Sequence, residues 1–153
     1  MQTMLNITGR VKFTITMDPT SLLFDDRKIK WEDFLNMIDH HIDFLNEEDE
    51  TDTPPFKKKR RKYKREDMLT ESFVIPVKPF IENAEPLEDA TIVVFERQDG
   101  DHYELSLTEA KQGVFAFSYK GRALTEDGPL HFYYGNGSNK DHPVRGIQKI
   151  VIK

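Results

Sequence analysis

Residues 123 to 139, ALTEDGPLHFYYGNGSN, hold the pattern that most restricts how this chain can fold. Residues 126 to 129 (EDGP) form a turn sequence, because glycine accepts a positive φ and proline fixes φ without donating a hydrogen bond. Residues 130 to 134 are rich in aromatic side chains, which suit a pleated surface, and predict a strand. The glycine- and asparagine-rich residues 135 to 139 end that strand in a loop. We therefore expect a sheet in the C-terminal part of the chain.

Two further patterns define the N-terminal part. Residues 9 to 17 alternate between apolar and polar side chains, which predicts one half-buried strand closed by Asp18-Pro19. From Trp31 the apolar residues recur at helical spacing, which predicts an amphipathic helix over residues 31 to 46. The adjacent His40 and His41 diverge by about 100° on such a helix, so we interpret them as solvated and predict no metal site.

The middle and the end of the chain continue the alternation of strands and turns. Residues 77 to 87 contain or adjoin Pro76, Pro79 and Pro86, and we expect an extended crossing segment there. The other expected elements are a strand from residue 73, a hairpin over residues 91 to 107 turning at Asp99-Gly100, a helical turn at residues 108 to 110 ending at Gly113, a buried strand over residues 114 to 117, and a last strand over residues 147 to 152.

The composition fits a single domain over residues 1 to 153, long enough to bury a core. Cysteine is absent, which excludes disulfides, thiolate metal ligands and cysteine nucleophiles. No stretch approaches the roughly 20 apolar residues that span a bilayer, so we expect a cytoplasmic protein that does not associate with a membrane. The expected fold class is α+β, with a mostly antiparallel sheet and one amphipathic helix.

Residues 47 to 66 are expected to form a charged mobile insertion, because their composition cannot bury an apolar face. Five of the six residues 47 to 52 are acidic, and eight of the nine residues 57 to 65 are basic. The basic run could be an electrostatic arm for nucleic acid or an acidic partner, with a tyrosine available to stack on a base. We favour the alternative that the two blocks neutralise each other, and expect nucleic acid not to be a partner. The arm comprises Lys57, Lys58, Lys59, Arg60, Arg61, Lys62, Tyr63, Lys64 and Arg65.

The candidate binding site is a set of polar side chains on the strand at residues 130 to 134 and on the loop after it. Such a set could bind an anion or an amide if the loop folds over the sheet, or the loop could be purely structural. The carboxylates Glu126 and Asp127 are interpreted as solvated, and no catalytic residues are predicted. The candidate residues are His131, Tyr133, Asn136, Ser138, Asn139, His142 and Arg145.

Residues 99 to 134, followed by a loop and QKIVIK, resemble the end of the molybdopterin-binding oxidoreductase fold of the sulfite oxidase type. The resemblance implies that family's fold. In the family a cysteine thiolate binds molybdenum, and because this chain has no cysteine we expect no cofactor and no metal. The matching positions are Asp99-Gly100, Leu107, Ala110, Ala116, Tyr119-Lys120-Gly121, Leu124, Gly128-Pro129 and residues 150 to 152, and the counterparts of the family's phosphate-binding loop are limited to Ser138, Lys140 and Arg145.

The whole chain, with its segments ITGRVKF, FDDRKI, VIPVKPFIENAEPL and GPLHFYYGNGSN, is similar to a family of short bacterial proteins of the Bacillus group, uncharacterised or labelled peptidyl-prolyl isomerase. We expect a cofactor-free binding or accessory protein whose partner is a protein or a small polar ligand. An enzyme, in the form of a prolyl isomerase, is the alternative.

Overall fold

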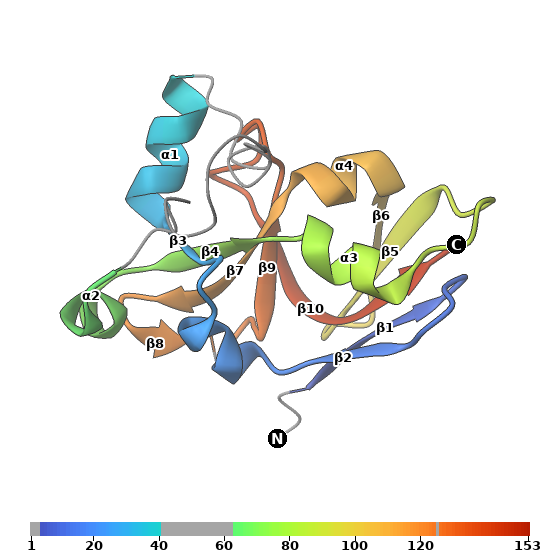
Figure 1. The fold of residues 1–153 in the computed structure, drawn as a ribbon, viewed down its shortest axis with the longest axis horizontal. Coiled ribbons are helices and arrows are strands. Elements are labelled where there is room, and N and C mark those ends of the chain that lie inside the picture. The colour runs from blue at the N-terminus through green and yellow to red at the C-terminus, as the bar shows by residue number, and fades with distance from the viewer. Residues whose placement is uncertain (1–3, 41–62, 125) are drawn as a thin grey trace, which may run out of the picture.

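The computed structural model describes residues 4–40, 63–124 and 126–153, and Figure 1 shows its helices and strands. The N-terminal elements are β1 (Leu5–Gly9), β2 (Ile15–Met17), the 3-10 helix η1 (Pro19–Phe24), β3 (Ile29–Lys30) and α1 (Trp31–Asp39). The elements after residue 62 are α2 (Arg65–Thr70), β4 (Phe73–Pro76), α3 (Lys78–Ala84), β5 (Ile92–Arg97), β6 (His102–Ser106), α4 (Leu107–Gln112), β7 (Val114–Tyr119), β8 (Arg122–Ala123), β9 (Leu130–Tyr133) and β10 (Val144–Ile152).

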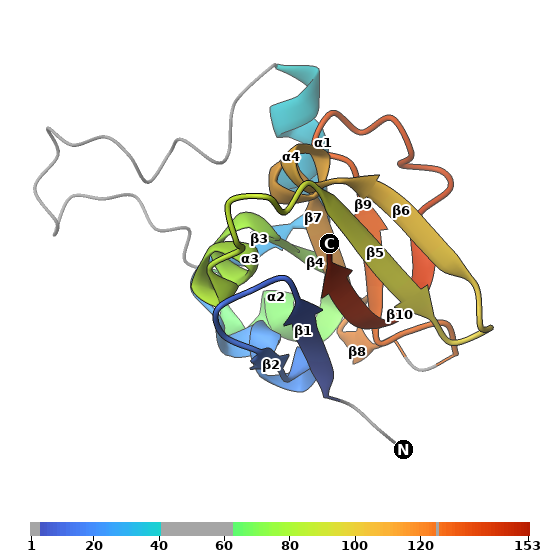
Figure 2. The same ribbon diagram turned by 90° about the vertical axis from the view of Figure 1, so that its right-hand side faces the viewer.

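A curled sheet organises the molecule, and β10 lies at its centre (Figure 2). The strand order is β2-β1-β10-β9-β7-β4-β3, while β5 pairs with β10 and with β6. Because β10 is long and its register shifts between Val144 and Ile147, its first part can pair with β9 and its later part with β1, while β5 pairs with residues 147–152. The C-terminal strand therefore joins the first strands of the chain to the rest of the sheet.

The sheet is mixed. β1 and β10 run parallel, with Ile7 opposite Ile150, whereas the other pairings in the described chain are antiparallel. The expected combination of helices and sheet is confirmed, and the expectation of a mostly antiparallel sheet is confirmed in part, because β1 and β10 are parallel.

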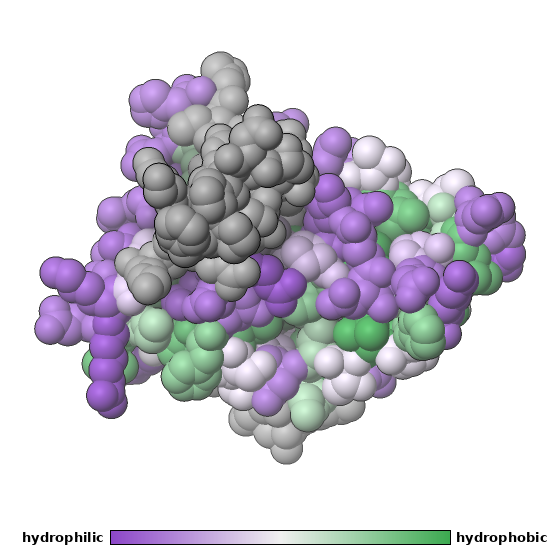
Figure 3. Space-filling view, in the orientation of Figure 1, coloured by the Kyte–Doolittle hydropathy of each residue, from purple (hydrophilic) through white to green (hydrophobic). Residues whose placement is uncertain are grey.

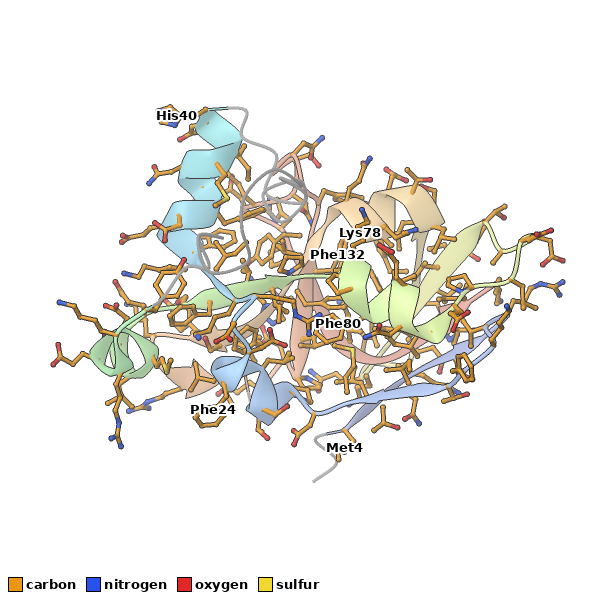
Figure 4. All side chains as sticks on the ribbon, in the orientation of Figure 1. Met4, Phe24, His40, Lys78, Phe80 and Phe132 are labelled. Carbon is orange, nitrogen blue, oxygen red and sulfur yellow. The ribbon has the colours of Figure 1, made fainter. Side chains whose placement is uncertain are left out.

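Each face of the sheet buries its own cluster of apolar side chains. On β7, Phe115 and Phe117 point into the larger core with α3, α4 and η1, whereas Val114 and Ala116 point into a smaller core beneath α1. This division follows from the two-residue period of a strand, which sends successive side chains to opposite faces. Phe132 of β9 is fully buried near the centre of the larger core (Figure 4).

The single strand expected over residues 9 to 17 is wrong. The chain forms β1 before this segment and returns as β2, with Leu5 paired to Met17. Gly9 marks the break: its φ is +101°, and a β-carbon there would overlap the backbone carbonyl oxygen of Ile152. Phe13, which the alternation placed on the buried face, is 54% exposed.

The extended segment expected over residues 77 to 87 is also wrong, because α3 occupies its first half. Pro79 lies in the first turn of α3, where a backbone N–H has no helical partner, so proline is tolerated there. Phe80, Ile81 and Ala84 lie on one side of this seven-residue helix and are buried in the larger core. The expectation of one helix is likewise corrected, since the described residues form four α-helices and one 3-10 helix.

The remaining expectations agree more closely with the structure. The hairpin of β5 and β6, the short α4 before Gly113, and the strands β4, β7, β9 and β10 are confirmed. The helix expected over residues 31 to 46 begins at Trp31 as predicted, and α1 ends at Asp39. Residues 41 to 62, which include most of that helix's second half and most of the charged insertion, lie outside the described residues.

Candidate functional site

The face of β9 that α1 covers carries two of the seven candidate residues, and a third, Arg145 of β10, is linked to them through Asp127. His131 and Tyr133 lie opposite Ala116 and Val114 of β7, on the side of the sheet that α1 covers. Phe132 and Tyr134 point to the other side and pack in the larger core. This alternation is the one that the sequence predicted for the strand.

Asp127 connects His131 to Arg145 of β10. Its Oδ1 atom is 3.0 Å from Nε2 of His131, and its Oδ2 atom is 3.7 Å from a guanidinium nitrogen of Arg145. The His131 side chain is 11% exposed, that of Asp127 39% and that of Arg145 55%. We call Asp127, His131, Tyr133 and Arg145 the β9 cluster.

The Nε2 atom of His131 is buried and has no hydrogen-bond partner in the described chain. The Asp127 oxygen is close enough to accept a hydrogen bond, but it does not lie along the direction in which a ring N–H would point. The pair is therefore an electrostatic contact rather than an aligned hydrogen bond. Native proteins leave few buried polar atoms in this state, so such an atom calls for a functional or structural explanation.

Tyr133 places a neutral hydroxyl beside the same groups. Burial raises the pKa of this phenol, the charge of Arg145 lowers it, and the charge of Asp127 raises it further. The ring of Tyr133 packs against Trp31 of α1, with 4.6 Å between the ring centroids. Its hydroxyl has no hydrogen-bond partner among residues 4–40, 63–124 and 126–153.

Backbone hydrogen bonds hold the turn that carries Asp127 in place. The N–H of Gly146 donates to the carbonyl of Asp127 at 2.6 Å, and the side-chain amide of Gln98 donates to the carbonyl of Glu126 at 2.8 Å. On β10, the carbonyl of Arg145 accepts a hydrogen bond from Nε of Arg97 at 2.7 Å. The carboxylate and the guanidinium of the cluster thus project from a fixed backbone, which favours binding over mere solvation.

The other four candidate residues do not join the cluster. Asn139 closes its own loop, accepting from the N–H of Tyr134 at 2.8 Å and donating to the carbonyl of Phe132 at 3.2 Å. Asn136 accepts from the N–H of Ser138, while the side chains of Ser138 and His142 are exposed. The hydrogen bonds of Asn136 and Asn139 stabilise the loop itself. This agrees with the alternative that the loop is purely structural.

Asp127 was missed by the sequence interpretation, which treated it as solvated together with Glu126. Glu126 is indeed exposed. The available signal was the spacing of Asp127 and His131 across the intervening Gly-Pro turn, since a turn of this length can return a carboxylate to the start of the following strand. The Gly128-Pro129 peptide bond is cis.

The described end of the basic run has a structural environment. The Tyr63 ring packs edge-on against Phe73, with 5.1 Å between centroids, and its hydroxyl donates to Asp33 at 2.8 Å. Lys64 caps α2 and Arg65 is the first residue of that helix. Tyr63 is thus engaged in the fold rather than presented for base stacking, and residues 63 to 66 of the expected insertion belong to the folded chain. Lys57 to Lys62 lie outside the described residues.

The residues present do not fit a molybdenum cofactor. The sulfite oxidase type binds the metal through a cysteine thiolate, and this chain contains no cysteine. In the portions of the chain that the structure describes, no three His, Cys, Asp or Glu residues are grouped as metal ligands. The same portions contain no helix long and apolar enough to cross a membrane.

No protein-family model matches the chain, and neither does any curated protein. A similar solved structure is that of the sulfane dehydrogenase SoxCD from Paracoccus pantotrophus, with a TM-score of 0.55 at 12% sequence identity. The match covers 97% of this chain but 37% of the SoxCD chain. At this identity the likeness concerns the fold alone. The chain therefore has the architecture of part of a sulfite oxidase-like protein, as its C-terminal sequence indicated.

Proposed function

We propose that this protein is a cofactor-free binding protein that holds a small polar ligand at the β9 cluster. The observation that supports the proposal is the excess of unused hydrogen-bonding capacity at one place. The buried Nε2 of His131 lacks an aligned partner, the Tyr133 hydroxyl has none in the described chain, and the half-exposed Arg145 guanidinium contacts the Asp127 carboxylate. A ligand with acceptor oxygens could bond to these groups, and the buried Nε2 of His131 is the atom among them that is costly to leave without a partner.

Binding accounts for the cluster better than catalysis does. A nucleophilic mechanism needs a hydroxyl or amine within hydrogen-bond reach of a base that a third group orients. Ser118 of β7 is buried, and its hydroxyl accepts a hydrogen bond from the N–H of Phe73 at 3.1 Å, so it serves the pairing of β4 with β7. The cluster itself contains a histidine, a carboxylate and a tyrosine hydroxyl, but no serine, threonine, cysteine or lysine.

Ligand binding can be tested by recording amide NMR spectra while a panel of small carboxylates, phosphates and amides is added to the full chain. We expect shifts in the amides around residues 127–133 and 144–146, and their loss in Arg145→Gln. Arg122→Gln is the matched control, because Arg122 is an exposed arginine on β8 and does not belong to the cluster. Shifts that persist in Arg145→Gln, or an unaltered spectrum with every compound, would contradict the proposal.

We also infer from the whole-chain resemblance that the protein belongs with the short bacterial proteins of the Bacillus group and acts in the cytoplasm. The prolyl isomerase label of that family is the alternative function. Such an enzyme would bury a peptide in an apolar, aromatic groove, whereas two surface hollows of about 270 and 350 Å³ beside β5 and β10 are lined mainly by polar and charged residues. On the face in Figure 3, hydrophobic residues are interspersed with hydrophilic ones.

The two functions differ in a refolding assay. Proline isomerisation relaxes over tens to hundreds of seconds without a catalyst. We expect the protein not to accelerate the proline-limited refolding of a model substrate. An acceleration that saturates with substrate concentration would establish the isomerase instead.

A further inference from the structure

We propose that this protein forms a homodimer through the outward face of β1, β10, β5 and β6, which we call the open face. These four strands pair in the order β1-β10-β5-β6, and Figure 2 shows them side by side. Their opposite face carries side chains of the larger core, together with those of α3 and α4. The inference does not depend on the binding function of the β9 cluster.

The strand register arranges the side chains of the open face in two rows across the four strands. In the first row Lys149 of β10 lies opposite Glu96 of β5, and in the second row Val151 lies opposite Val94. Their neighbours along each strand point to the core, as the two-residue period requires. β1 and β6 extend both rows at their ends. The flanking residues are Asn6 and His102 in the first row and Thr8 and Glu104 in the second.

This arrangement is complementary to itself about a two-fold axis that runs along the strands between β10 and β5. Such an axis lays β10 of one copy over β5 of the other and leaves positions along the strands unchanged, so every contact occurs twice. Lys149 then faces Glu96 of the second copy, and Val151 faces Val94 of that copy. An axis across the strands at Val151 is disfavoured, because it would oppose the positive charges of Lys149 and Lys153.

The two charges of the first row can make this contact with a second copy. Lys149 and Glu96 are cross-strand neighbours, yet neither forms an ion pair with another residue of the described chain. Lys149 is exposed and Glu96 is half-buried. Two hollows of about 270 and 350 Å³ adjoin each other at Glu96 and leave room for side chains of a partner. Packed sheets are rotated by about 30°, which displaces the outer strands more than those beside the axis. The contact of Lys149 with Glu96 is therefore the one to test.

The size of the open face sets the strength of the dimer. Its four strands, spaced about 4.8 Å apart and about 17 Å long, give an outline of roughly 300 Å². This is less than the roughly 800 Å² that each partner buries in a standard stable interface. We therefore expect a weak dimer that forms at high protein concentration and dissociates further with added salt, because its central contacts are ionic.

The experiment measures the mass of the full chain by sedimentation velocity between about 10 μM and about 1 mM. The average mass of the unaltered protein is expected to rise towards that of two chains. Lys149→Glu and Glu96→Lys each place like charges opposite one another, and each is expected to weaken dimerisation by at least about tenfold. Lys140→Glu and Glu88→Lys are the matched controls, because they make the same changes of charge at exposed residues outside these four strands.

Mixing the two variants distinguishes this geometry from a general effect of charge. In the mixed dimer each contact again joins opposite charges: Lys149 of one chain faces Glu96 of the other, and the introduced glutamate faces the introduced lysine. We expect the mixture to regain the dimer that neither variant forms by itself. A mass that stays unchanged on mixing overturns the proposed axis.

Two further outcomes overturn the inference. A mass of one chain at every concentration of the unaltered protein leaves the open face to a different partner. Equal dimerisation of the two variants and their controls places the interface on another surface. If a variant fails to fold, the amide NMR shifts that accompany dilution of the unaltered protein locate the interface, and shifts outside β1, β10, β5 and β6 overturn the inference.

Discussion

At the scale of single residues, Tyr63 shows how the tertiary structure reassigns a side chain. In the sequence it interrupts a run of basic residues and suggests a base-stacking ring. In the fold its hydroxyl accepts a hydrogen bond from the N–H of Lys30 at 3.0 Å and donates to Asp33 at 2.8 Å. The ammonium groups of Lys28 and Lys30 lie over its ring, 5.9 and 5.6 Å from the centroid. Tyr63 therefore ties the chain that enters α2 to β3 and α1.

Replacing Tyr63 with phenylalanine keeps the ring contacts and removes both hydrogen bonds. The N–H of Lys30 and the carboxylate of Asp33 then lose a partner, and we expect the free energy of unfolding to fall by about 1–3 kcal/mol. Urea unfolding measures the change. Tyr119→Phe is the control, because the Tyr119 side chain is 60% exposed. Equal stability of the two variants would show that the Tyr63 hydroxyl contributes nothing.

A second residue-scale prediction concerns the hydrogen-bonded hydroxyls of Tyr103 and Tyr134, whose oxygens are 2.6 Å apart. Burial, then the hydrogen bond and the charge of Tyr103, and then the charge of Glu109 raise the pKa of Tyr134 above its ordinary range. The folded state thus binds this proton more tightly than the unfolded chain does. Its stabilising contribution is complete below about pH 10 and is lost as the pH rises further.

Unfolding measured at about pH 8 and about pH 11 tests this dependence. We expect Tyr134→Phe to lose less stability between these two pH values than the unaltered protein loses. The same comparison with the exposed Tyr119→Phe separates the partly buried pair from the general effect of alkali. If Tyr134→Phe and the unaltered protein lose the same amount of stability, the Tyr103–Tyr134 pair does not cause the loss of stability at high pH.

At the scale of elements, α4 and α3 form for different reasons: α4 has a local capping signal, whereas α3 depends on burial in the tertiary structure. α4 begins with a capping box in which the Ser106 hydroxyl accepts from the N–H of Glu109 at 3.0 Å and the Glu109 carboxylate reaches back to the N–H of Ser106. The sequence predicted one helical turn at residues 108 to 110 from its end at Gly113, and the structure adds the capping box at its start. α3 has no such cap, and Pro79 with the flanking Pro76 and Pro86 favoured an extended chain.

The element-scale prediction is that Ser106→Ala reduces the free energy of unfolding by about 1 kcal/mol, the usual contribution of an N-cap hydroxyl. Chemical denaturation of the full chain measures it. Ser138→Ala removes an exposed hydroxyl in a loop and is expected to leave the stability unchanged. A loss at Ser106 no larger than that at Ser138 would mean that packing alone holds α4.

At the scale of the whole molecule, the distribution of charge decides whether the basic run binds nucleic acid. Binding would release counterions from phosphates, so the affinity would fall steeply with salt. The chain carries a net charge of −5, and the acidic residues 47 to 52 compete for the same lysines and arginines at high local concentration. We therefore predict weak or absent binding by the intact protein.

The prediction is tested with a labelled oligonucleotide at about 50 and about 200 mM salt. Neutral residues in place of the acidic block should increase the affinity markedly at the lower salt concentration. The positions to replace are Glu47, Glu48, Asp49, Glu50 and Asp52. Tight, salt-dependent binding by the unaltered protein would instead establish the basic run as a nucleic-acid arm.

The sequence by itself determined the elements whose signals are local. The hairpin of β5 and β6, α4, and the alternating faces of β9 follow from turn residues, caps and the two-residue period, which act over a few residues. His131, Tyr133 and Arg145 were identified as candidates because residue type and position along the chain can also be read locally.

Only the tertiary structure decided features that depend on distant partners. β1 is a strand because β10 pairs with it from the other end of the chain, and α3 is a helix because the larger core buries its apolar side. Asp127 belongs to the β9 cluster because hydrogen bonds from Gln98 and Gly146 fix its turn over β9 and β10. Local propensities are small beside the burial and pairing that such long-range contacts supply, so these contacts determine the outcome.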